Sequence, residues 1–160
     1  MRLISHRGNT NGNYLHKENC RKTLDQVIKL GYDVEVDLWK IGEKLYLSHD
    51  KPNYDDLINE SWLLENSDNL LVHAKNREAL DYLLNGWNQR KGYNHSIFHY
   101  FSHENDKYAW TNRGYLIVFP GYEAIEHANV IIMMPEQGTR IPKTCYGICS
   151  DFVENYIGKV

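Results

Sequence analysis

The chain has 160 residues, of which 42% are hydrophobic and 24% are charged, and these values are typical of one globular domain. A formal net charge of -3 argues against recognition of nucleic acid through a broad basic surface, and no run of about eighteen apolar residues could span a membrane. We therefore expect a single domain over residues 1–160 that is cytoplasmic, binds no nucleic acid and has no stable membrane insertion.

Apolar runs that predict strands alternate with helical patterns along the chain. The predicted strands span residues 2–5, 33–38, 45–48, 70–74, 97–101, 115–119, 130–133 and 146–149. One helix is predicted to begin after Asn19, acting as its N-cap, and to end at Gly31, and a second helix is predicted from Arg77 to Leu84.

Strand–helix alternation is typical of parallel α/β architecture, whose functional residues lie at the C-terminal ends of the strands. A full eight-stranded barrel needs at least about 200 residues. The expected fold is therefore α/β: a reduced or incomplete TIM (β/α) barrel, with parallel strands and minimal helices in the second half. A flavodoxin-like domain is the alternative, but the sequence has no glycine-rich phosphate loop of the G-x-G-x-x-G type.

Two carboxylates lie two residues apart in one predicted strand. In the sequence Val34-Glu35-Val36-Asp37-Leu38, the period of two places Glu35 and Asp37 on one face. Two neighbouring carboxylates repel unless a positive group lies between them, and Mg²⁺ or Ca²⁺ would supply that charge. A solvent-facing edge strand is the competing interpretation of this strand taken alone.

Polar residues follow three other predicted strands. His6 and Arg7 follow the first strand, His49 follows Leu45 to Ser48, and His73 and Lys75 end the strand that begins at Leu70. Phosphodiester cleavage needs one group that takes a proton, another that gives one, and cations that stabilise the phosphoryl oxygens. Together with the carboxylate pair, these residues match that requirement.

The same residues resemble a known family. Ser5-His6-Arg7-Gly8, Glu18-Asn19, Glu35-Val36-Asp37 and His49-Asp50 are similar, in order and spacing, to the N-terminal signature of the glycerophosphodiester phosphodiesterases, which are phospholipase-like TIM-barrel enzymes. The motifs cover roughly the first third of the chain. Lys17 occupies a position where the family usually has proline, and the second half of the chain resembles the family only loosely.

The resemblance implies roles for individual residues. His6 and His49 would be the catalytic acid and base, and which is which stays open. Arg7 and Lys75 would bind the phosphate, and Glu18 would support the site or its substrate.

The resemblance also implies metal ligands. Glu35 and Asp37 would hold a divalent ion, with Mg²⁺ or Ca²⁺ favoured. His73 is the candidate third ligand, at a position where the family normally has glutamate, and an imidazole ligand would move the preference towards Mn²⁺ or Zn²⁺. Asp50, Glu104 and Asp106 are the other candidates for the third position.

The sequence thus predicts a metal-dependent phosphodiester hydrolase that acts on a small glycerophosphodiester-like substrate. Two alternatives stay open: a phospholipase D- or C-type lipid phosphodiesterase, and a non-catalytic descendant that only binds a phosphorylated ligand. A trimmed barrel would expose apolar surface that a second copy could cover, so a homo-oligomer is also compatible with the sequence.

Overall fold

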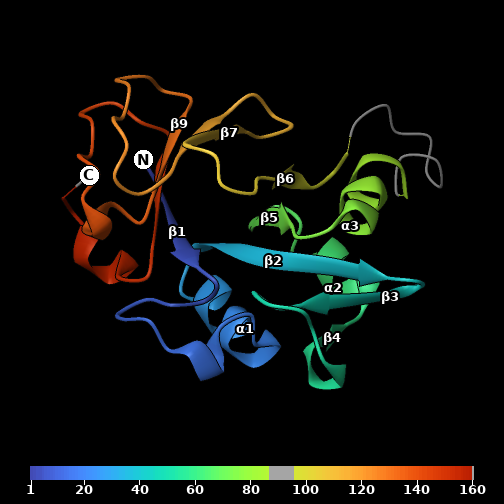
Figure 1. The fold of residues 1–160 in the computed structure, drawn as a ribbon. Helices are drawn as coiled ribbons and strands as arrows, with labels where there is room; N and C mark the ends of the chain where they lie inside the picture. The colour runs from blue at the N-terminus through green and yellow to red at the C-terminus, as the bar shows by residue number, and fades with distance from the viewer. Residues whose placement is uncertain (87–95, 160) are drawn as a thin grey trace.

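The computed structural model describes residues 1–86 and 96–159, which form a ten-stranded mixed sheet with three α-helices (Figure 1). The strands are β1 (Arg2–His6), β2 (Asp33–Ile41), β3 (Lys44–Leu47), β4 (Leu57–Ile58), β5 (Leu70–Ala74), β6 (His99–Phe101), β7 (Tyr108–Trp110), β8 (Leu116–Val118), β9 (Val130–Met133) and β10 (Gly147–Ser150). The α-helices are α1 (Arg21–Lys29), α2 (Glu60–Glu65) and α3 (Arg77–Asp81). Shorter helical segments are η1 (Leu15–Lys17), η2 (Tyr54–Asp56), η3 (Tyr82–Gly86), η4 (Pro135–Gln137) and η5 (Val153–Tyr156).

Parallel pairing runs through the strands in the order β6-β5-β2-β1-β10-β9-β8. Strand β3 is antiparallel to β2, β4 is antiparallel to β3, and β7 is antiparallel to β8. The first strand therefore pairs with the last, and both lie in the middle of the sheet. All eight strands predicted from the apolar runs are present, whereas the short strands β4 and β7 were not predicted.

The sheet curls around a core that both of its ends share. Side chains from β5 and β6 pack in one cluster with side chains from β8, β9, β10 and β1: Ile4, Leu71, Phe101, Ile117, Ile131, Met133 and Cys149. Asn112, after β7, ties the two ends together, because its Nδ2 donates to the carbonyl of Phe98 at 3.0 Å and its backbone N–H donates to the carbonyl of Tyr100 at 3.0 Å.

In the part of the chain that the structure describes, α-helices cover the outer face of one half of the sheet. In β2, Val34 and Val36 point outwards and pack in a second cluster with Leu24 of α1 and Leu63 of α2, all of them buried. Glu35 and Asp37 alternate with these valines and point to the inner face, as the period of two predicts. Among the described residues, no helix is long and apolar enough to cross a bilayer.

The predicted reduced TIM barrel is wrong. The sheet is mixed rather than parallel, and its strands do not alternate with helices: α1, α2 and α3 all lie between β1 and β6, and in the described chain after β6 the connections are loops and 3-10 turns. A chain of 160 residues is too short for eight strand–helix units of the usual length. Loops such as residues 119–129 cover the outer face of β8 and β9 instead, where Ala124 packs against Val118 and Val130.

Candidate functional site

The predicted site residues meet at the C-terminal ends of the parallel strands. Strand register pairs His6 with Glu35, and Asp37 with His73, on the inner face of the sheet. Residues in register on neighbouring strands lie about 5 Å apart. The polar side chains of β1, β2 and β5 therefore lie close together on the inner face of the curled sheet. These side chains lie directly above the apolar cluster that fills the inside of the sheet.

The β2–β3 hairpin carries His49 back to the same place. Leu47 pairs with Leu38, and the backbone N–H of Ser48 donates to the carbonyl of Asp37 at 3.1 Å. His49 follows directly and has a half-exposed side chain, whose Nδ1 lies 3.1 Å from Asp50 Oδ1. The antiparallel β2–β3 hairpin therefore places His49, the second histidine, at the site.

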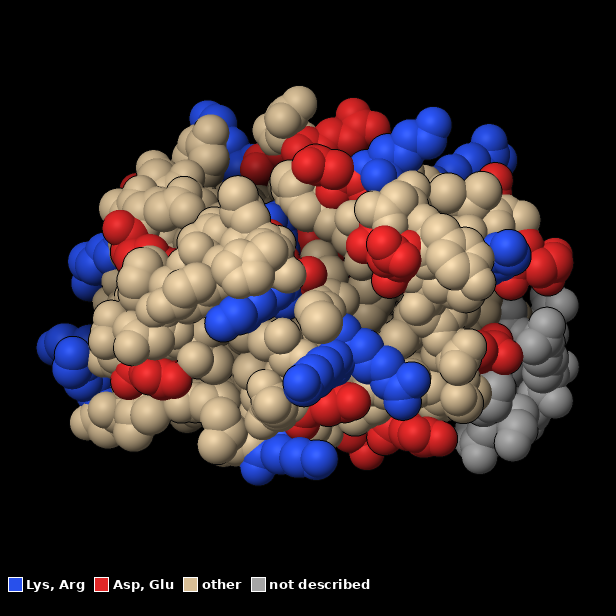
Figure 2. All heavy atoms as spheres, turned by 90° about the horizontal axis from the view of Figure 1, so that it is seen from below, with Lys and Arg blue, Asp and Glu red and all other residues tan. Residues whose placement is uncertain are grey.

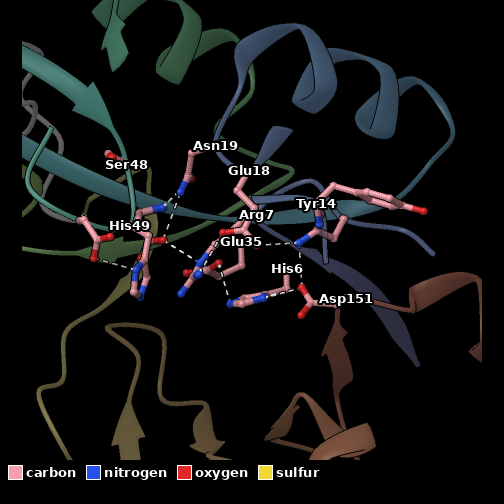
Figure 3. Close-up of polar contacts among 12 residues, drawn as sticks. His6, Arg7, Tyr14, Glu18, Asn19, Glu35, Ser48, His49 and Asp151 are labelled. Carbon is pink, nitrogen blue, oxygen red and sulfur yellow. Dashed lines mark hydrogen bonds and ion pairs between the residues drawn. The ribbon is translucent and has the colours of Figure 1, made fainter. Parts of the chain in front are cut away.

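The convergence creates a cavity of about 220 Å³. Six of the predicted residues line it: His6, Arg7, Glu35, His49, His73 and Lys75. The other two, Glu18 and Asp37, contact Arg7, and Figure 3 shows Glu18 beside Arg7. All eight side chains singled out from the sequence are thus within one site.

His6 is oriented by a carboxylate from the far end of the chain. Its Nδ1 donates to Asp151 Oδ1 at 2.8 Å, because an ionised carboxylate can only accept, and its Nε2 lies 3.9 Å from Glu35 Oε2 (Figure 3). Burial lowers the pKa of His6, but the hydrogen bond to Asp151 and the charge of Glu35 outweigh it and raise the pKa. Asn9 Nδ2 also donates to Asp151 Oδ1, at 2.9 Å.

Arg7 lies between two carboxylates. Its Nη1 donates to Glu18 Oε2 at 3.1 Å, and its Nε lies 2.9 Å from Asp37 Oδ2, a close ion pair without hydrogen-bond alignment. Asn9 Nδ2 donates to Glu18 Oε1 at 3.0 Å. Because Asn9 contacts both Glu18 and Asp151, one buried amide connects the Arg7 side of the site with the His6 side.

Asp37 is a buried anion surrounded by donors. His73 Nδ1 donates to its Oδ1 at 2.9 Å, and Lys75 Nζ lies 3.4 Å from the same oxygen. Burial raises the pKa of Asp37, but the hydrogen bond from His73 and the charges of Arg7 and Lys75 more than reverse this and hold the pKa well below its usual range. Asp37 is therefore ionised at neutral pH.

Glu35 has the opposite environment. It is 2% exposed, and its Oε2 has no hydrogen-bond partner among the described residues. Burial, together with the negative charge of Asp37, raises the pKa of Glu35. An unpartnered buried carboxylate oxygen is costly unless a cation accompanies it.

Glu35, Asp37 and His73 fit a metal ion. Their ligand atoms all lie within 4.8 Å of one another, and all three residues are buried. The set combines two carboxylates with an imidazole, and Glu35 Oε2 is free to bind an ion. Of the other candidates for the third position, Glu104 lines the cavity, whereas Asp50 contacts His49.

Left-handed backbone conformations cluster at the site. Among the described non-glycine residues, positive φ angles occur at Arg7 (55°), Asn19 (55°) and Met134 (42°). Arg7 and Met134 line the cavity, and Asn19 contacts Asp37. Such conformations cost of order 1–3 kcal/mol each and concentrate where function requires a particular geometry.

The prediction that Asn19 caps the first helix is wrong. Cys20 is the N-cap of α1, and Asn19 instead binds Asp37 at two points: its Nδ2 donates to Asp37 Oδ2 at 3.1 Å, and its Oδ1 accepts from the Asp37 backbone N–H at 3.0 Å. The amide therefore holds the central carboxylate of the site. The predicted end of the helix is confirmed, since Leu30 is the C-cap and Gly31 follows with a φ of 92°.

Three contributors to the site were not assigned roles from the sequence: Asn9, His103 and Asp151. His103 lines the cavity, its ring stacks on that of His73 with centroids 4.8 Å apart, and its Nδ1 is buried without a partner among the described residues. Burial and the charges of His73 and Lys75 lower the pKa of His103 to about 4. Asp151 follows Ser150 directly after the last predicted strand, and this position at a strand end is the sequence signal that could have identified it.

No protein-family model, no curated protein and no solved structure matches the chain. The interpretation of the site therefore rests on its own geometry and chemistry.

Proposed function

We propose that this protein is a metal-dependent phosphodiester hydrolase that acts on a small glycerophosphodiester-like substrate. The observation that carries the proposal is the convergence of two histidines, two cations and the buried carboxylate of Glu35 on one cavity of about 220 Å³. Each of these groups has a function in phosphodiester cleavage, and they come from four strands, β1, β2, β3 and β5. The cavity is large enough for a phosphate group with a small substituent.

His6 and His49 provide proton transfer. Because Asp151 accepts the Nδ1 proton of His6, the other ring nitrogen, Nε2, is left to exchange a proton within the cavity. His49 is half-exposed, and its Nδ1 lies 3.1 Å from Asp50 Oδ1, which leaves its Nε2 for the substrate. The cavity is thus lined by one buried imidazole and one accessible imidazole, each with its Nε2 free to exchange a proton.

Arg7 and Lys75 provide positive charge for the phosphate. Both line the cavity, and both contact Asp37, which fixes their positions before substrate binds. Glu18 holds the far side of the Arg7 guanidinium at 3.1 Å. Preorganised cations stabilise charge that develops on phosphoryl oxygens without a reorganisation cost during the reaction.

Glu35, Asp37 and His73 would hold the metal ion. When bound, a divalent ion supplies charge neutralisation and Lewis-acid polarisation of a phosphoryl oxygen. The two carboxylates favour Mg²⁺ or Ca²⁺, and the imidazole of His73 makes Mn²⁺ or Zn²⁺ an alternative that metal reconstitution distinguishes.

The test is hydrolysis of bis(p-nitrophenyl) phosphate and of glycerophosphocholine, before and after EDTA, with Mg²⁺, Ca²⁺, Mn²⁺ and Zn²⁺ added back separately. Metal-restored turnover is expected, with a loss of about 10²–10⁴-fold in each of His6→Ala and His49→Ala. His127→Ala is the matched control, because His127 is exposed and precedes β9 by three residues, at the N-terminal end of that strand and away from the site.

Retained turnover in both histidine variants would contradict the proposed acid–base pair. If no ion restores turnover in a folded protein that binds metal or phosphate, the alternative of a non-catalytic ligand-binding protein replaces the enzyme.

A further inference from the structure

A larger cavity adjoins the candidate active site. Its volume is about 600 Å³, and it shares His49 with the cavity that contains His6. One wall consists of residues 15, 16 and 18–22, from η1 to the start of α1, and the other consists of residues 47–50 and 55–58, from the end of β3 to β4. A substituent on the His49 side of a bound phosphate would therefore extend into this space.

The two walls carry opposite charges. Arg21 and Lys22 lie on the α1 wall, and Asp55 lies on the wall that includes η2. Neither Lys22 nor Asp55 has an oppositely charged partner among the described residues, and Arg21 has only a loose contact of 3.8 Å with Asp25. These three charges are therefore available to a ligand.

Other acidic residues of the second wall are already engaged. Asp50 contacts His49, and Asp56 accepts from the backbone N–H of Asn53 in a capping box at the start of η2. Asp55 is thus the carboxylate on this wall that is free to pair with a cation. Figure 2 shows that acidic and basic side chains are interspersed on the face seen from below, which includes the region of α1, rather than separated into broad patches.

The smaller cavity also contains apolar side chains. Phe101, Phe119 and Met133 contribute apolar and aromatic surface there. A substituent that extends from the phosphate past His49 would consequently lie among the charged side chains of the larger cavity.

We propose that the larger cavity binds the alcohol portion of the substrate, and that this alcohol is a zwitterion carrying an ammonium and a carboxylate group, as serine does. The ammonium pairs with Asp55, and the carboxylate pairs with Lys22 and Arg21. This inference rests on the proposed phosphodiesterase function and specifies its substrate class.

The position of His49 at the junction of the two cavities assigns the proton transfers. A water oxygen forms a bond to phosphorus and its proton passes to His6, while the bond from phosphorus to the alcohol oxygen breaks and that oxygen receives a proton from protonated His49. The products are a phosphomonoester and the zwitterionic alcohol. No oxidant, reductant or further reactant is required.

The test compares three substrates that differ only in the alcohol: glycerophosphoserine, glycerophosphoethanolamine and glycerophosphoglycerol. With the metal-loaded protein, kcat/KM is expected to be highest for the serine diester, by about fivefold for each charged group that pairs with the protein. Hydrolysis of bis(p-nitrophenyl) phosphate, measured in parallel, reports the proposed function independently of the alcohol.

Two variants probe the two walls separately. Lys22→Ala is expected to lower the ratio of kcat/KM for the serine diester to that for the ethanolamine diester by about fivefold. Asp55→Asn is expected to lower the ratio for the ethanolamine diester to that for the glycerol diester by a similar factor. Lys29→Ala, an exposed lysine at the other end of α1, and Asp68→Asn, an exposed aspartate near the start of β5, are the matched controls and should leave both ratios unchanged.

Turnover of bis(p-nitrophenyl) phosphate without a preference for the serine diester would overturn the inference while leaving the phosphodiesterase function in place. Equal ratios in the wall variants and in their controls would have the same consequence. Absence of turnover with all four substrates and every ion would overturn the proposed function, and this inference with it.

Discussion

Replacing Glu35 by glutamine separates two effects of a buried carboxylate, namely its cost to the metal-free protein and its value as a ligand. Glu35 is buried, and its Oε2 has no hydrogen-bond partner among the described residues. Its pKa is raised by burial and by Asp37, so the metal-free protein loses stability as the pH rises from the ordinary value of 4.5 through the raised pKa. Glu35→Gln removes this loss, because glutamine does not ionise.

The size of the effect follows from the unpartnered oxygen. A buried polar group without a partner costs about 1–3 kcal/mol, and more if it is charged. For a chain of this length each kcal/mol changes Tm by about 2–4 °C, so the metal-free variant should melt about 2–12 °C above the wild type at pH 8. The wild type should gain about 2.7 kcal/mol from a metal ion present at a hundred times its Kd, and the variant should lose most of that gain.

The assay is thermal unfolding followed by circular dichroism at pH 5 and pH 8, with EDTA or with each divalent ion. Glu43→Gln, an exposed position in the β2–β3 turn, is the matched control and should behave as the wild type does. A metal-free Glu35→Gln protein that melts at or below the wild-type temperature at pH 8 would refute the argument from the unpartnered oxygen. An undiminished metal-induced shift in the variant would show that Glu35 is not a ligand.

Three further predictions concern the orientation of His6, the hydrogen bonds that hold Asp37 and the packing of the hydrophobic core. In Asp151→Asn the lost charge lowers the pKa of His6, so the His6 titration observed by NMR should move to lower pH, and an unchanged titration would contradict the assigned pair. Asn19→Ala removes two hydrogen bonds to Asp37 and should cost about 2 kcal/mol in urea unfolding, whereas a loss below about 0.5 kcal/mol would contradict that role. Leu63→Ala, at a fully buried position in α2, should lower the free energy of unfolding by about 2–5 kcal/mol in the same assay. A loss as small as that expected at an exposed position would indicate that α2 does not pack as described.

Local patterns in the sequence predicted the strands well. Each of the eight apolar runs forms a strand, and the runs at Leu70–Ala74 and Val130–Met133 have the predicted bounds. The missed strands, Leu57–Ile58 and Tyr108–Trp110, are too short to show a period of two. The barrel prediction failed because strand order and pairing direction depend on how distant segments meet, which strand-helix alternation alone does not determine.

The site residues were predictable where a polar side chain interrupts an apolar strand, as at Glu35 and His73. They were not predictable where the role depends on a distant partner. Asn19 has the residue type and position of a helix cap, but its side chain instead donates a hydrogen bond to Asp37, 18 residues further on. Asp151 orients His6 across 145 residues of chain, a distance over which local periodicity carries no information.

The pairing of β1 with β10 has a consequence for the order of events during synthesis. His6 leaves the ribosome 145 residues before Asp151, so the nascent chain carries an imidazole without its partner carboxylate until β10 has been synthesised. The glutamate and aspartate of β2 are likewise exposed to solvent until the two halves of the sheet close around them. Formation of the site is thus a late and cooperative step in the folding of this chain, because it requires β1 and β10 to pair.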